Sequence, residues 1–187
     1  MAADALEQAE YFYERMMETL KIPSEFRFNT NAFIMSGRNI TRVLQKEFSK
    51  NAKFQSWHTQ KQEKIGKEGL MDFFEEAGNM SVKERPLRSA SSVYIRQLAI
   101  KKLPEDLKNA PFVLTEEGQA FWITKNEEGK EEQIRVSEFD NEIALQYYFV
   151  NPQPPQTFRN LQVIELCGLY LSALRDLVKE TLKIARD

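Results

Sequence analysis

The sequence predicts a mainly α-helical protein, a four-helix bundle that carries a small antiparallel β insert and is α+β overall. Three observations support this fold class. Apolar residues recur at helical spacing in four segments of the chain. Residues 88–137, before the last of these segments, are instead rich in β-branched and aromatic residues and contain turn signals. The composition, 42% hydrophobic and 29% charged, is typical of a globular domain with its own core.

The first helix is expected at residues 4–20 and the second at residues 31–48. The apolar stripe of the first is Leu6, Ala9, Tyr13, Met16, Met17 and Leu20, and that of the second is Phe33, Ile40, Val43, Leu44 and Phe48. Pro23 should end the first helix, and Asn29 or Thr30 should cap the second. A third helical region starts near Lys53, is interrupted by two glycines and resumes at residues 70–83, as one broken helix or as two.

The β insert is expected to be a meander. Residues 115–118 and 126–129 each end in a glycine that can take a positive φ, so they predict tight turns between strands. Residues 91–100 could form a strand or an extended arm. Residues 138–150 suit a helix turn and a buried strand about equally.

Three prolines in residues 151–156 predict a linker, and the longest apolar stripe of the chain predicts the last helix at 160–185. That stripe is Val163, Leu166, Cys167, Tyr170, Leu174, Leu177 and Val178. We therefore expect a single domain, 1–187, with residues 1–87 in the helical bundle, 88–150 in the β-rich insert and 157–187 in the last bundle helix.

Composition limits the chemistry that is expected. A net charge of -2 gives no general basic field for nucleic acid, and one histidine and one cysteine exclude a two-histidine metal site or a cysteine cluster. We expect no metal and no cofactor. His58 is interpreted as a partly buried histidine and Cys167 as a core residue. The acidic N-terminus and the lack of a long apolar run predict no signal peptide, no membrane span and a cytoplasmic location.

One segment gives a more specific indication. The relevant stretches are NAFIMSGRNITRVLQKEF, the tryptophan in FQSWHTQKQ, and LMDFFEEAGNMSVKERPLRSA. Together, over roughly residues 28–95, they resemble the bacterial HEPN-like family of small helical-bundle proteins. Many members are metal-independent endoribonucleases that act as dimers. The resemblance implies a homodimer through the helices at 31–48 and 70–83. It also implies a role in a defence or toxin–antitoxin locus.

The two reactive side chains of that family are missing. Its arginine falls on Gly78 and its histidine on Lys83. Lysine, with an unperturbed pKa near 10.4, is a poor base at neutral pH, and glycine cannot hold a scissile phosphate. We therefore expect no catalytic residue of the usual family mechanism.

A binding groove could remain where the motif lies. Its candidate residues are Arg38, Asn39, Glu75, Asn79, Lys83 and Glu84. Glu75, Asn79 and Lys83 share a helix face at four-residue spacing. A phosphate or a carboxylate of a partner would fit such a groove. In the simpler interpretation, Arg38 pairs with Glu75 or Glu84 and only joins two helices.

Three hypotheses for function follow. The leading one is a non-catalytic HEPN-like binding or regulatory protein that contacts RNA, a nucleotide or a partner protein. The alternative is a metal-independent endoribonuclease with a non-standard site, in which Lys83, His58 or Arg38 replaces the missing pair. The third is a structural or interaction protein with no nucleic-acid role, whose binding should persist in salt.

Overall fold

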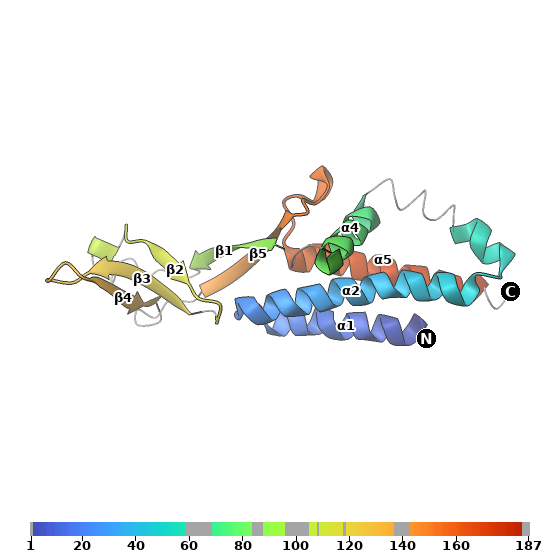
Figure 1. Cartoon of the computed structure of the whole chain (residues 1–187), viewed down its shortest axis with the longest axis horizontal. Coiled ribbons are helices and arrows are strands. Elements are labelled where there is room, and N and C mark those ends of the chain that lie inside the picture. Colours follow the sequence, from blue (N-terminus) through green and yellow to red (C-terminus); the bar gives the residue numbers. More distant parts are fainter. Residues whose placement is uncertain are drawn as a thin grey trace.

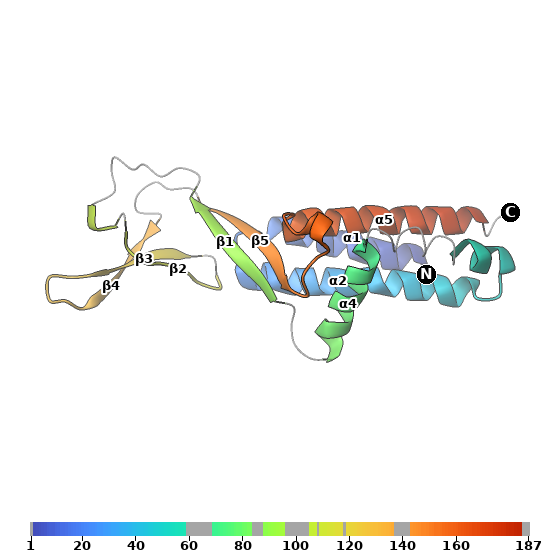
Figure 2. The same cartoon turned by 90° about the horizontal axis from the view of Figure 1, so that it is seen from above.

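Three long helices lie side by side and form the body of the protein, and a β arm projects from one end of it (Figure 1). The computed structural model describes residues 2–58, 69–83, 88–95, 105–107, 109–117, 119–136 and 143–184. The long helices are α1 (Ala2–Glu18), α2 (Pro23–Phe48) and α5 (Val163–Ile184). The shorter α4 (Leu70–Lys83) crosses α2 and α5 at a steep angle, as the view from above shows (Figure 2). Residues 52–58 are also helical.

The mainly helical fold with a small antiparallel β insert is therefore confirmed, whereas the predicted four-helix bundle of the HEPN type is not. Of the helices that the structure describes, only α1, α2 and α5 run along one another, and α4 contacts α2 and α5 from across them.

The start of α2 was placed wrongly by the sequence. Pro23 was expected only to end the first helix, but it occupies the first turn of α2, where its missing N–H is not needed. The expected caps, Asn29 and Thr30, lie inside α2. The Thr30 hydroxyl donates to the carbonyl of Phe26, and the Asn29 amide donates to the Thr19 hydroxyl, which fastens α2 to the end of α1.

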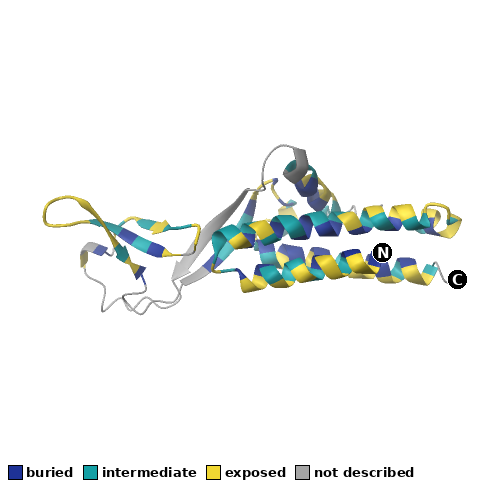
Figure 3. Ribbon diagram, turned by 60° about the horizontal axis from the view of Figure 1, so that its bottom comes forward, coloured by how far each residue is buried: buried dark blue, intermediate teal, exposed yellow. Residues whose placement is uncertain are grey.

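The main core lies between the helices, and their buried faces point inward (Figure 3). Its centre is aromatic. Phe74 of α4 stacks on Tyr170 of α5 with ring centroids 4.0 Å apart, and Phe33 of α2 meets the same Tyr170 edge-on. Gly37 allows this packing, because a Cβ there would lie 2.6 Å from Cε1 of Tyr170.

The arm consists of two antiparallel sheets. Strands β1 (Arg88–Ile95) and β5 (Ile143–Asn151) form a ribbon that leaves the helical body. Strands β2 (Phe112–Leu114), β3 (Ala120–Lys125) and β4 (Glu131–Arg135) form the second sheet, with β3 in the middle. Residues 143–151, which the sequence left open between helix and strand, are thus a strand; residues 96–100 and 137–142 lie outside the described residues.

Several contacts join the arm to the body. The Tyr147 ring of β5 stacks on Phe26 of α2, with centroids 4.0 Å apart, and its hydroxyl donates to the Leu20 carbonyl. The backbone N–H of Ser24 donates to the carbonyl of Glu116 in the β2–β3 turn, at 3.1 Å. This contact gives a partner to one of the N–H groups that a helix start leaves unpaired.

The second sheet has a small core of its own, formed by Leu107, Ala120, Trp122 and Val136. The turn after β3 is tight, as predicted: Gly129 has φ +76°, and the Asn126 side chain accepts hydrogen bonds from the backbone N–H groups of Glu128 and Lys130. Gly118, the other predicted turn glycine, lies outside the described residues.

The predicted linker at 151–156 and the last helix are found at these places. Pro152 and Pro154 are buried, and a 3-10 turn at Gln156–Phe158 precedes α5. The Glu165 carboxylate accepts from the backbone N–H of Gln162, a side-chain contact typical of a helix start. Within the described part of the chain, the helices are too short or too polar to cross a bilayer.

Candidate functional site

Arg38 and Asn79, two of the predicted site residues, meet where α4 crosses α2. An Nη2 hydrogen of Arg38 donates to Oδ1 of Asn79 in a partly buried contact. The sequence predicted Glu75 or Glu84 as the partner of Arg38, but the acceptor of this hydrogen bond is Asn79. The contact nevertheless supports the simpler interpretation of Arg38, in which it joins two helices.

Gly78 belongs to the same crossing. A Cβ at position 78 would lie 2.9 Å from Cδ of Arg38, closer than real Cβ contacts come. The residue at 78 must therefore be small for Arg38 to pass over α4 and reach Asn79. A packing requirement of this fold explains Gly78 without reference to a lost arginine.

Glu75 is exposed on α4, but its charge affects the pKa of the buried Tyr170. Burial is the main cause that raises the pKa of the Tyr170 phenol well above its usual value; Cys167 and Glu75 raise it further, and Arg38 lowers it. Arg38, Glu75 and Tyr170 thus lie in one electrostatic neighbourhood around the crossing of α4. The phenol stays neutral there at physiological pH.

The structure describes only some of the remaining predicted site residues. Lys83 is the last residue of α4, and the structure describes its backbone but not its side chain. Glu84 lies outside the described residues. Asn39 is exposed on α2, next to Arg38 in the chain but on another side of the helix. The structure therefore joins Arg38, Glu75 and Asn79 around one helix crossing and does not place Asn39 among them.

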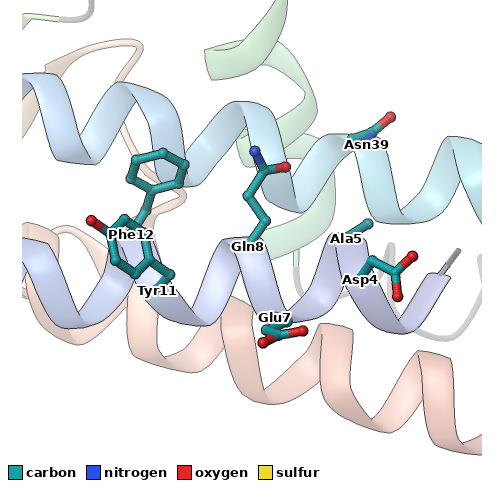
Figure 4. Close-up of a pocket in the computed structure, with 7 residues that line it drawn as sticks. All are labelled: Asp4, Ala5, Glu7, Gln8, Tyr11, Phe12 and Asn39. Atoms are coloured by element: carbon teal, nitrogen blue, oxygen red, sulfur yellow. The ribbon is translucent and has the colours of Figure 1, made fainter.

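Asn39 instead lines an open groove between α1 and α2. One hollow of about 710 Å³ is lined by Asp4, Ala5, Glu7, Gln8, Tyr11, Phe12 and Asn39. A second hollow of about 450 Å³ is lined by Gln8, Phe12, Ala32, Met35, Ser36, Arg38, Asn39 and Arg42. The two hollows share Gln8, Phe12 and Asn39, so we treat them together as the α1–α2 groove. Figure 4 shows the residues of the larger hollow.

The floor and centre of the groove are apolar. Tyr11 is 55% exposed, and its ring meets Phe12 edge-on with centroids 5.3 Å apart. Met35 and Ala32, from α2, are half-buried beside them. On the same side of α2, one turn before Ala32, Phe28 is 60% exposed and lies under the Arg27 guanidinium. Aromatic and methionine side chains are the types that protein interfaces favour over the rest of the surface.

The sequence did not single out this groove. Tyr13 and Met16 of α1 were named as core, and only Arg38 and Asn39 of the groove were named as candidates. A helical projection would have shown the signal: Gln8 and Tyr11 of α1, and Phe28, Ala32 and Met35 of α2, form stripes on the sides of these helices that do not face the core.

His58 and Cys167 do not line the groove. His58 packs against Phe54, with ring centroids 5.2 Å apart, and burial lowers its pKa. Cys167 is fully buried in α5, and burial raises the pKa of its thiol well above the usual value. Among the described residues, no group of three or more His, Cys, Asp or Glu side chains is arranged to hold a metal ion.

The fold and the groove define the class of this protein: it has a helical body with a β arm and an open surface groove. The family model described as bacteriophage lambda protein ea47 matches residues 2–137. The chain therefore belongs to the family of bacteriophage lambda protein ea47. Comparisons with curated proteins and with solved structures found no match.

This family membership corrects the resemblance to HEPN-like proteins, which was wrong. The stretches that carried the resemblance, between residues 28 and 95, have the apolar spacing of amphipathic helices, a pattern that many helical proteins share. The family match covers residues 2–137, from α1 to the end of β4, and leaves no support for a HEPN domain. Gly78 and Lys83 are thus not the remains of a ribonuclease motif.

Proposed function

We propose that this phage-family protein is a non-catalytic binding protein that acts on a protein partner through the α1–α2 groove. The observation that carries the proposal is the groove itself, which has an aromatic and methionine-lined centre between charged rims. A small ligand is usually enclosed over most of its surface, whereas this groove is open along its length. Such an open surface fits the face of another protein better than a metabolite or nucleotide.

The distribution of charge favours protein over nucleic acid. Helix α1, which forms one rim, has five acidic residues and one basic residue. The turn and strand at the tip of the arm add Glu127, Glu128, Glu131 and Glu132, all exposed. These acidic side chains disfavour phosphate groups, because binding to nucleic acid depends on clustered basic side chains and the basic residues here, Arg42 of the groove and Lys130 of the turn, lie among acids.

The groove also offers little for catalysis. Its arginine nearest to the α4 crossing, Arg38, already donates to Asn79, and the histidine lies elsewhere. We propose that the interaction takes place in the cytoplasm, with which a single free thiol is consistent.

Site-specific photo-crosslinking tests the proposal. A benzophenone amino acid at position 35, in the groove, should form adducts with protein in phage-infected cells, and these can be identified by mass spectrometry. The same amino acid at position 17 is the control, because Met17 is 46% exposed on α1 but does not line the groove. Adducts to RNA or DNA at position 35, or equal adducts at both positions, would overturn the proposal.

A further inference from the structure

The two rims of the α1–α2 groove carry opposite charges. Asp4 and Glu7 come from α1, and Arg38 and Arg42 come from α2. The Arg38 guanidinium already donates to Asn79 of α4, so Arg42 is the rim cation placed to meet a partner.

The whole helices differ in the same sense, with five acidic residues against one basic in α1 and four basic against two acidic in α2. Two of the α1 acids do not belong to the rim, because Glu10 is paired with Arg175 of α5 and Glu18 with Arg15. A partner that fits this groove must therefore present a basic strip and an acidic strip, side by side.

The two charged rims also lie at the same level along the groove. Helices α1 and α2 are joined by a short turn and run in opposite directions (Figure 1). Asn39 of α2 lines one hollow with Asp4 and Glu7, and Gln8 of α1 lines the other with Arg38 and Arg42. The acidic and basic rims are thus opposite one another rather than at opposite ends.

We propose that the occupant of the groove is a second copy of this chain, related by a two-fold axis parallel to α1 and α2. This rests on the proposed function, because it names the partner of the same groove. Such an axis lays α1 on α2 of the partner at the same level. The acidic rim then faces the basic rim of the other copy, and symmetry produces this contact twice.

The opposite arrangement is disfavoured by charge. A two-fold axis perpendicular to the helices and lying in the interface would place α1 on α1 of the partner, an acidic helix against an acidic helix. Like charges facing one another are a strong penalty in interfaces. In the proposed arrangement the centre holds Tyr11, Phe12 and Met35, and the charges lie at the rim, as interfaces are usually built.

Charge exchange tests the pairing. Glu7→Arg and Arg42→Glu should each raise the dimer dissociation constant about tenfold, since like charges then meet at two symmetric places. The double variant restores opposite charges and should return to nearly native affinity. Asp176→Arg, an exposed acid-to-base change on α5, is the matched control and should leave it unchanged. Sedimentation velocity over a concentration series gives the constants.

Cysteine crosslinking tests the axis. Cys167 is buried, so an introduced cysteine is the accessible thiol. Under mild oxidation, a Glu7→Cys chain mixed with an Arg42→Cys chain should give a covalent dimer that neither chain gives alone. Efficient self-crosslinking of the Glu7→Cys chain would show α1 on α1 and overturn the proposed axis.

The outcomes separate this inference from the proposed function. A chain that stays monomeric at all concentrations, while position 35 crosslinks to another protein, overturns the second copy as occupant and leaves the groove as a docking site. A monomer with no groove-specific crosslink overturns both. Failure of the double variant to regain affinity overturns the pairing of Glu7 with Arg42.

Discussion

Gly37 of α2 faces Tyr170 and Leu174 of α5, and its lack of a side chain is required there. The Cβ of an alanine would be 2.6 Å from Cε1 of Tyr170, whose ring is held by its stack on Phe74. We expect Gly37→Ala to destabilise the protein by about 2 kcal/mol, as overpacking does, despite its better helix propensity.

The loss of stability in Gly37→Ala can be compared with that in Gly78→Ala. The Cβ at position 78 would meet the aliphatic part of Arg38, which can move, so the loss should be smaller. Urea unfolding of the two variants measures the difference. Equal losses would show that the Tyr170 ring is not held in place.

Arg38 and Asn79 act as a structural pair in this account. Removing either side chain loses one partly buried, charge-assisted hydrogen bond, worth about 1.5 kcal/mol. A double-mutant cycle of Arg38→Ala and Asn79→Ala should therefore give a coupling free energy of about 1 kcal/mol in unfolding. Asn79→Ala should leave self-association unchanged, because Asn79 does not line the groove. Weaker association of Asn79→Ala would mean that the α4 crossing is part of the interface.

Tyr147 predicts how stability depends on pH. Burial raises the pKa of its phenol to about 12, whereas an unfolded tyrosine ionises near 10. Its neutral form therefore contributes stability in full below about pH 10, and this is lost as the pH rises towards 12, on the order of 2 kcal/mol. Urea unfolding at pH 8 to 11 should show the decline, and Tyr147→Phe should reduce it, leaving the part due to Tyr170. Identical slopes in the two proteins would contradict the assignment.

At the scale of elements, the helices were predictable from sequence because burial on one side gives a period that can be read directly. The start of α2 was not, since Pro23 fits both the end of one helix and the first turn of the next. The contacts of Ser24 with Glu116 and of Asn29 with Thr19, which accompany this helix start, cannot be read from the sequence. The strand at 143–151 was not either: its pairing with 88–95 is a long-range contact. The role of Gly78 likewise depends on a helix crossing.

The arm sheet should behave as a separate cooperative element, because its core of Leu107, Ala120, Trp122 and Val136 is distinct from the helical core. Trp122→Ala should remove about 3 kcal/mol from it. In hydrogen exchange, β3 and β4 should lose protection while α1, α2 and α5 keep theirs. Equal loss of protection in the helices would show that body and arm unfold together.

At the scale of the whole molecule, the proposed two-fold axis gives the arms a defined arrangement. An axis parallel to the helices keeps their direction, so both β arms project from the same end of the dimer. Each tip would then lie away from the helical body, as the arm of a single copy does (Figure 2). The homodimer expected from the HEPN-like resemblance, through the helices at 31–48 and 70–83, is a different arrangement, and homodimer formation stays a prediction.

The most direct test of the α1–α2 groove is sedimentation velocity of Met35→Glu beside Met17→Glu. Both variants add one carboxylate to a methionine position on the surface, but only Met35 lines the groove. We expect the native protein and Met17→Glu to sediment as dimers at micromolar concentration, and Met35→Glu as a folded monomer, because a charge cannot be buried unpaired in the centre of the contact. A dimeric Met35→Glu protein would contradict the account.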